Sequence, residues 1–338
     1  MRANPTIVDI AKRLGLSDST VSRSLNHRPD PFISEATRER VLAAAAELGY
    51  RPNKLAAALV TGKTHTIGLW VSGVRTQYYT EVTYHLQDRL RQDGYELIPD
   101  PAGGMGRPKP DTFPFSPWPF DGIMACDPPG EMKMYRDNPA LRQMPLVSVG
   151  VFYWAETDHV GIDLFSGARS AVRHLLKFGS RIALVAPRLE DSRVEPRYRA
   201  YRDEMARAGL DTEFIYVPSN ERSDARKIIR QYVRRHGCPR GLFAYNDHIA
   251  VGVHRGLKDL GISIPAEAAL IGCDGIEDTE YHDPAISTID MCLGTVSRLA
   301  WKFLRRRINN PKLGPQRIIV KPRLVIRESA EYQKGRKS

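Results

Sequence analysis

The sequence predicts a helix-turn-helix head, a hinge helix and an α/β core made of two doubly wound lobes with parallel sheets. Three observations support this fold class. The first 50 residues show three capped helical patterns, and residues 52–62 form a short helical stretch between a proline and a glycine. From residue 66 onward, short apolar runs alternate with amphipathic segments, which is typical of parallel sheets covered by helices.

The head begins with three helix-capping residues. Thr6 is followed three positions later by an acidic residue, a variant of the capping box, while Ser17 and Ser34 can cap a second and a third helix. Gly15 and Gly49 can end the first and third helices in the left-handed conformation. Two helices joined by the short turn at residues 15–17 predict a helix-turn-helix unit.

The second helix, "SDSTVSRSLN", has few apolar side chains to bury, since only Val21 and Leu25 face inward. Short hydroxyls and an arginine on an exposed helix are suited to phosphates and base edges in a DNA major groove. The alternative is an ordinary solvated face, and these ten residues alone favour it. The expected polar face contains Asp18, Ser19, Ser22, Arg23 and Asn26.

The core alternates between the two kinds of element. Strands are expected at residues 66–72, 121–126, 145–150, 159–163, 181–187, 213–218, 241–245 and 268–273. Helices are expected at residues 78–94, 167–179, 197–209, 222–236 and 247–261. Residues 99–120 are rich in proline and glycine, so we expect an irregular, partly exposed connection there.

Composition excludes several classes of protein. The net charge of +11 favours anionic partners, and no apolar run has the length of a signal peptide or a membrane span. The four cysteines are far apart and form no CxxC pair, which indicates neither disulfides nor a zinc site. There is no P-loop, GxSxG or complete GxGxxG motif, so we expect no enzyme, no cofactor and no metal. A cytoplasmic protein without membrane contact is expected.

The stretches "TIVDIAKRLGLSDSTVSRSLN" and "ISEATRERVLAAAAELGYRPNKLAAALVTGKTHTIGLW" closely resemble the N-terminus of the LacI/GalR family of bacterial transcription regulators. "RYRAY", "AYND" and "LIGCDGIE" follow in the family's order. The resemblance implies a homodimer on a pseudo-palindromic operator, with a core like that of periplasmic binding proteins. It implies domains at 1–51 (head), 52–65 (hinge and linker) and 66–338 (core). Lobe 1 would span about 66–163 and 293–320, and lobe 2 about 164–292 and 321–330.

The resemblance also implies roles for individual residues at the DNA. Asp18, Ser19 and Arg23 would read bases, although Asp18 is equally explained by favourable electrostatics at a helix N-terminus. Leu59 would unstack a base step in the minor groove, and a core stripe is the alternative for the two hinge leucines. The full set of expected DNA-binding residues is Thr6, Ser17, Asp18, Ser19, Thr20, Ser22, Arg23, Asn26, Asn53, Leu55, Ala56 and Leu59.

Polar side chains follow several predicted core strands, where ligands of open α/β sheets bind. Asn246, Asp247 and Asp274 follow strands, Arg197 opens a helix, and the loop after the first strand ends in Tyr78 and Tyr79. Carboxylate, guanidinium, amide and aromatic groups together suit a sugar. Individually, Asp274 can cap a turn, Asn246 can form an Asx-turn, and Arg197 can be a surface ion-pair partner. By resemblance these three match effector-contacting positions, and Asp163, with Trp70, Trp154 and Asn220, is a further candidate.

The sequence therefore predicts a DNA-binding transcription regulator, a repressor controlled by a sugar-like effector. Two departures from the family pattern keep an alternative open, namely a non-sugar effector or lost sensing. The loop "SGVRTQYY" lacks the family's Asp and Asn-Pro, and the segment 99–120 replaces a helix of the family's dimer interface. A solute-binding protein of a transport system would instead need a signal peptide and would lack a DNA-binding head.

Overall fold

The computed structural model describes residues 5–25, 30–50, 58, 62–71, 76–100, 120–127, 135, 137–189 and 192–332. The chain divides into two compact units, residues 1–65 and 66–338. The expected DNA-binding positions Asn26, Asn53, Leu55, Ala56 and Leu59 lie outside the described residues, as does most of the segment 99–120.

The head consists of α1 (Ile7–Leu14), α2 (Asp18–Ser24) and α3 (Glu35–Leu48). All three predicted caps are present, because Thr6, Ser17 and Ser34 each accept a hydrogen bond from a backbone amide of the first turn. Gly15 and Gly49 end α1 and α3 with φ of 66° and 69°. The helices enclose a small core of Ile10, Ala11, Val21, Val41, Ala44 and Ala45. The predicted helix-turn-helix head is confirmed.

Replacing Ser34 by Ala is expected to destabilise α3 by about 1 kcal/mol, because the Thr37 amide and hydroxyl lose their partner. Hydrogen exchange of the full chain should show faster amide exchange in peptides from residues 35–48. Peptides from the core serve as the internal control. Unchanged exchange in α3 would show that this cap contributes nothing.

Lobe 1 is built on a six-stranded parallel sheet with the order β11-β5-β4-β3-β1-β2. Its strands are β1 (Thr66–Val71), β2 (Glu96–Asp100), β3 (Gly122–Cys126), β4 (Leu146–Gly150), β5 (Asp158–Ile162) and β11 (Arg317–Val320). Its helices are α5 (Gln77–Arg91), α7 (Pro139–Gln143) and α12 (Leu293–Asn309). The inner strands β1, β3, β4 and β5 are almost entirely buried, which explains their continuous apolar runs.

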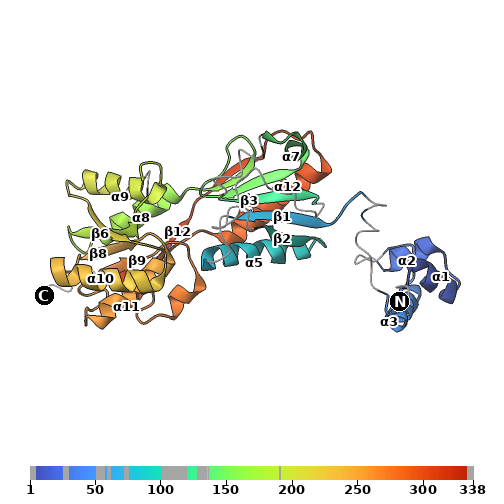
Figure 1. The fold of residues 1–338 in the computed structure, drawn as a ribbon, viewed down its shortest axis with the longest axis horizontal. Helices are drawn as coiled ribbons and strands as arrows, with labels where there is room; N and C mark the ends of the chain where they lie inside the picture. The colour runs from blue at the N-terminus through green and yellow to red at the C-terminus, as the bar shows by residue number, and fades with distance from the viewer. Residues whose placement is uncertain are drawn as a thin grey trace. The chain divides into compact units, whose positions relative to one another are not determined.

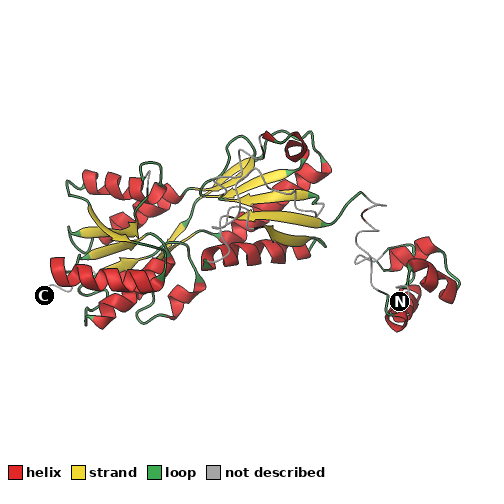
Figure 2. Ribbon diagram, in the orientation of Figure 1, coloured by secondary structure: helices red, strands yellow, loops and turns green. Residues whose placement is uncertain are grey.

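Lobe 2 has a four-stranded parallel sheet with the order β7-β6-β8-β9. Its strands are β6 (Ile182–Pro187), β7 (Glu213–Val217), β8 (Gly241–Ala244) and β9 (Ala269–Ile271). Its helices are α8 (Leu164–Leu175), α9 (Pro196–Arg207), α10 (Arg222–His236) and α11 (Asp247–Asp259). Figure 2 shows helices on both sides of this sheet. Two doubly wound lobes were predicted and are confirmed.

The chain passes between the lobes three times (Figure 1). It leaves lobe 1 after β5, returns after β10 (Thr288–Asp290), and leaves again between β11 and β12 (Arg323–Val325). β10 and β12 pair antiparallel, and two short 3-10 helices, η2 (Glu277–Tyr281) and η3 (Glu328–Ala330), complete lobe 2. Among the described helices, none is both long enough and apolar enough to cross a membrane.

The structure corrects two expectations. Pro99 and Asp100 are not part of an irregular connection but end β2, an edge strand, where a proline costs no ladder hydrogen bond. Tyr78 and Tyr79 were expected both at the end of a loop and at the start of a helix, and they lie in the first turn of α5, as the helix prediction requires. No element was predicted after residue 273, although the buried residues Val296, Ala300 and Leu304 of α12 follow helical spacing.

Candidate functional site

Helix α2 exposes the polar row that the sequence predicted. Asp18, Ser19, Ser22 and Arg23 are exposed, whereas Val21 and Ser24 are buried on the opposite side. The Arg23 side chain is 48% exposed, and its Nε donates to the Ser19 carbonyl at 3.4 Å. This hydrogen bond and a 3.7 Å ion pair with Asp30 are both long and open to water, so the guanidinium can exchange them for another partner.

Three other expected DNA-binding residues of the head have structural partners. The Ser17 hydroxyl lies 2.9 Å from the hydroxyls of both Ser19 and Thr20. The Thr6 hydroxyl donates to the Asp9 carboxylate at 2.7 Å within the capping box. Thr6, Ser17 and Thr20 all remain at least partly accessible, so these hydrogen bonds do not prevent a second contact with DNA.

In the core, Arg197 is a buried group held in one orientation. Its Nε donates to Glu195 at 2.7 Å, its Nη1 donates to the Tyr245 carbonyl at 2.8 Å, and its guanidinium lies 3.6 Å from the centre of the Tyr245 ring. Burial opposes the positive charge, but Glu195 and other acidic neighbours outweigh it and raise the pKa of Arg197 further. Within the described part of the chain its Nη2 makes no hydrogen bond. Arg197 is therefore a fixed donor and not a surface ion-pair partner.

Two predicted effector residues are helix caps. Asn246 caps α11 by accepting from the Ile249 amide at 2.8 Å, and this leaves its side-chain NH2 as a donor. Asp163 caps α8 by accepting from the Ser166 amide at 3.1 Å. Capping explains both residues locally, and it leaves the Asn246 donor open for a ligand.

Tyr78 and Asp274 come from different lobes and share one electrostatic environment. The Tyr78 side chain is 8% exposed, and its hydroxyl has no hydrogen-bond partner among the described residues. Burial, followed by Asp127 and Asp274, raises its pKa. Tyr79 packs edge-on against Tyr78, with ring centres 5.1 Å apart. A buried, unpartnered hydroxyl beside carboxylates indicates a ligand site.

Asp127, which sequence reasoning missed, belongs to this group. It directly follows β3, is 5% exposed, and accepts from the Phe152 amide at 2.8 Å. A side chain at Gly150 would bring its Cβ within 2.3 Å of the Asp127 carboxylate, so only glycine allows this approach. Its position after a buried strand is the signal that singled out Asp274, and it was available in the sequence.

Replacing Asp127 by Asn is expected to stabilise the core at neutral pH. Burial raises the Asp127 pKa from 3.8 to about 6, so the unfolded chain loses this proton first and the stability of the native protein falls as pH rises through that window. Two pKa units correspond to a loss of stability of about 3 kcal/mol. This loss is complete above pH 6 and absent below pH 4, and Asp127→Asn should remove it. Urea unfolding followed by tryptophan fluorescence reports on the core alone, since all four tryptophans follow residue 65.

The control for this prediction is Asp203→Asn, which removes an exposed carboxylate of α9. The Asp203→Asn variant should differ little in stability from the unaltered protein at both pH 4 and pH 7.5. An Asp127→Asn gain that is the same at pH 4 and pH 7.5 would contradict the assigned cause.

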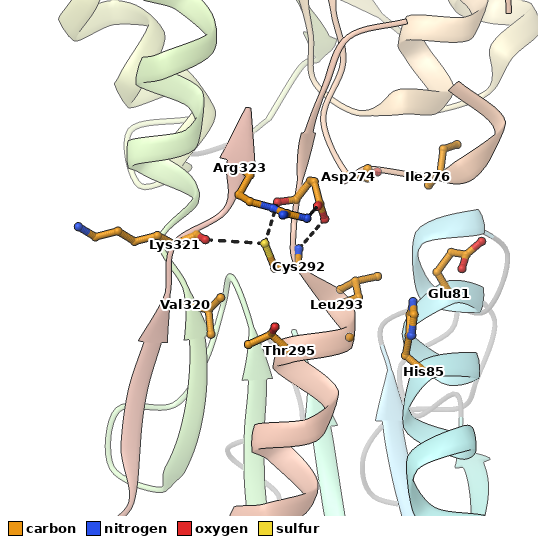
Figure 3. A pocket seen from close by; sticks show the side chains of 13 residues that line it. Glu81, His85, Asp274, Ile276, Cys292, Leu293, Thr295, Val320, Lys321 and Arg323 are labelled. Carbon is orange, nitrogen blue, oxygen red and sulfur yellow. Dashed lines mark hydrogen bonds and ion pairs between the residues drawn. The ribbon is translucent and has the colours of Figure 1, made fainter. Parts of the chain in front are cut away.

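A cavity of about 550 Å³ lies between the lobes where the chain crosses (Figure 3). Glu81 and His85 of α5 line it from lobe 1, and Asp274 lines it from lobe 2. Arg323 forms an ion pair of 2.6 Å with Asp290, and the Cys292 amide donates to the same carboxylate at 2.7 Å. Of the six predicted effector residues, Asp274 alone borders this cavity. Among the described residues, no group of His, Cys, Asp or Glu is arranged to hold a metal ion.

Comparisons with known proteins agree with this architecture. Residues 6–53 match the family model "Bacterial regulatory proteins, lacI family", and residues 172–330 match "Periplasmic binding protein-like domain". The ribose operon repressor of Escherichia coli (strain K12) is 29% identical over 334 residues, covering 96% of this chain and 99% of that protein.

Two solved structures share the fold. The lac repressor dimer bound to operator and the anti-inducer ONPF has a TM-score of 0.74 at 20% identity, covering 97% of this chain and 99% of that one. A LacI family transcriptional regulator from Enterococcus faecium with bound ribose has a TM-score of 0.67 at 22% identity, covering 78% and 98%.

Proposed function

Because the chain belongs to the LacI family of bacterial regulatory proteins, we propose that it is a repressor that binds operator DNA through α2. A small effector lowers or raises its affinity for the operator. One observation carries this proposal. A capped helix-turn-helix with its own core presents Asp18, Ser19, Ser22 and Arg23 to the outside, and the match to the lacI family spans it.

At the DNA, Arg23 would donate to guanine, while the hydroxyls of Thr20 and Ser22 would contact the backbone. A homodimer would place two heads on a pseudo-palindromic site, as expected of a twofold-symmetric regulator. The hinge residues Asn53, Leu55, Ala56 and Leu59 would act in the minor groove. The protein would work in the cytoplasm, on the bacterial nucleoid.

In the core, the effector would be a sugar or a sugar derivative. The Arg197 Nη2 and the Asn246 amide supply donors, Asp127 and Asp274 supply carboxyl groups, and the buried Tyr78 ring offers an apolar face. The regulator with bound ribose supports this class. Closure of the lobes would alter the hinge with a coupling free energy of about 1–3 kcal/mol. A non-sugar effector is the second candidate, favoured by two interacting carboxyl groups, the buried Asp127 and the half-buried Asp274.

The test has two arms on the full-length protein. Selection from a random duplex library should enrich a pseudo-palindromic site, and loss of enrichment with Arg23→Ala would connect it to α2. A thermal-shift screen against sugars, sugar alcohols and sugar phosphates should raise the melting temperature with a ligand that binds the folded state only. Hits should disappear in Asp274→Ala, which removes both the donor and the acceptor. Failure to enrich any site would overturn the repressor proposal, and an empty screen would overturn the sugar effector.

A further inference from the structure

Asp247 is a fully buried carboxylate that the proposed function does not use. It is the first residue of α11 and is 0% exposed. Its Oδ2 accepts from the Gly275 amide at 2.8 Å and the Ile276 amide at 3.0 Å, and the Thr288 hydroxyl donates to its Oδ1 at 2.7 Å. Because backbone amides can only donate, this arrangement holds Asp247 as an acceptor.

These bonds determine where Asp274 lies. The loop that carries Asp274 passes directly over the Asp247 carboxylate, since a Cβ at Gly272 would lie 2.1 Å from its Oδ1. Asp274 has φ 132°, which is rare for a residue with a side chain, and its amide donates to the Ile289 carbonyl at 3.1 Å. The surrounding contacts must therefore maintain this conformation, and Asp247 supplies two of the amide contacts next to it.

Asp247 also brings a negative charge close to Asp274. Burial is the largest cause that raises the Asp274 pKa, and Asp247 is the next. Burial raises the pKa of Asp247 itself only to about 6, because Thr288 and the two amides stabilise its anion. The Asp247 backbone amide donates to Asp274 and lowers its pKa, but the Asp247 carboxylate has two amides and the Thr288 hydroxyl as donors. Since no described side chain donates to Asp274, the proton of the pair belongs on Asp274.

The other charged groups around Asp274 do not reverse this order. Arg197 lowers its pKa, but Arg197 is already engaged by Glu195 at 2.7 Å. Asp127, which belongs to lobe 1, raises the pKa of Asp274, as Asp247 does. Asp290 is engaged by Arg323. Tyr78, Tyr245 and Cys273 also interact with Asp274, and Glu81 and His85 line the same cavity. Arg327 lowers the pKa of Asp247.

We propose that Asp247 is the positioning residue of the effector site, which holds the Asp274 loop in place and keeps Asp274 protonated, so that Asp274 donates a hydrogen bond to the effector. This inference rests on the proposed effector site. It also narrows the class of effector, because a protonated Asp274 and the Arg197 Nη2 both seek acceptors. Hydroxyl oxygens also accept hydrogen bonds, but a carbonyl or carboxylate oxygen accepts without a proton of its own to place. An effector that presents such an oxygen to Asp274, as a lactone or sugar acid does, is therefore favoured over a sugar alcohol.

The decisive test follows the protonation of Asp274 without any effector. The full chain is labelled with 13C at the aspartate carboxyl groups, its spectrum is titrated from pH 4 to pH 9, and Asp274→Asn assigns the signal. In the unaltered protein Asp274 should keep its proton at neutral pH. Asp247→Asn retains an oxygen that can accept from Gly275 and Ile276 but removes the charge, so the Asp274 midpoint should fall by about one pH unit or more.

Asp247→Ala separates charge from structure. It removes the acceptor as well, so it should both lower the midpoint and speed amide exchange at Gly275 and Ile276. If Asp247→Asn leaves the midpoint of Asp274 where it was, Asp247 has only a structural role and the proposal is overturned. An Asp274 signal that is already ionised at pH 6 in the unaltered protein overturns it as well.

A second readout tests the class of effector. Gluconate and gluconolactone are compared with glucitol, and other sugar acids with their alcohols, by thermal shift. The acid or lactone, which has a carbonyl or carboxylate oxygen, should bind better than the alcohol of the same pair. Asp247→Asn should reduce that preference. A preference for the alcohols would overturn the inference. If no compound binds although Asp274 titrates as expected, the sugar-effector proposal fails while the role of Asp247 stands.

Discussion

Replacing Arg197 by Ala is expected to lower the free energy of unfolding of the core by about 3 to 5 kcal/mol, in addition to abolishing effector binding. The reason is Glu195, which is 3% exposed and would be left as a buried charge without its partner. The Tyr245 carbonyl would lose its donor as well. Urea unfolding followed by tryptophan fluorescence measures the loss.

A second substitution separates folding from binding. Glu195→Gln removes the buried charge, yet its amide oxygen can still accept from the amides of residues 197 and 198, as Glu195 does at the start of α9. The double variant should therefore recover a large part of the lost stability without recovering effector binding. Arg199→Ala, an exposed arginine of the same helix, is the matched control and should cost little. An Arg197→Ala variant as stable as the unaltered protein would show that the ion pair does not stabilise α9.

Replacing Arg23 by Ala is expected to weaken binding to the selected operator by about 10- to 100-fold and to relax the preference for one base pair. A guanidinium that donates twice to a guanine discriminates against other bases by about 1–3 kcal/mol. The head should remain folded, because the Arg23 side chain is half exposed and its described contacts are a 3.4 Å bond to the Ser19 carbonyl and a 3.7 Å ion pair with Asp30.

Arg40→Ala is the matched control, since it removes the same charge from an exposed position of α3. Removal of a residue that contacts only phosphate should weaken binding to all DNA sequences alike and reduce the salt dependence of binding. Gel-shift titrations with operator, with operator variants at one base pair, and with unrelated DNA distinguish the two roles. An equal loss on every duplex after Arg23→Ala would place Arg23 at the backbone and not at a base.

Much of the head could be predicted because its signals are local. A cap such as Ser17 acts on an amide three residues away, and Gly15 adopts φ 66° for reasons contained within its own turn. The core strands were equally visible, because a strand buried on both faces must be apolar along its length. Such features depend on neighbours in the sequence and need no knowledge of the rest of the fold.

The effector cleft was predicted only in part, for a physical reason. The sequence identified Asp274 and Arg197 as polar residues near strand ends, and by itself it determined the class of protein and the order of its elements. It assigned no role to Asp127 or Glu195, and it identified Asp247 only as a polar residue that follows a strand, although all three carboxyl groups prove to be buried. Whether a carboxyl group is desolvated, paired or protonated depends on residues far away in the chain.

The sequence by itself thus determined the helix-turn-helix head, the parallel two-lobed core and the class of regulator. Only the tertiary structure decided that Arg197 is buried, paired with Glu195 and bonded to the Tyr245 carbonyl. It also decided that Asp247 lies beneath the loop of Asp274, because β8 and β9 are adjacent in the sheet of lobe 2. Helix caps and apolar strands are determined by local sequence, whereas the charge state of a buried site is determined by which strands become neighbours.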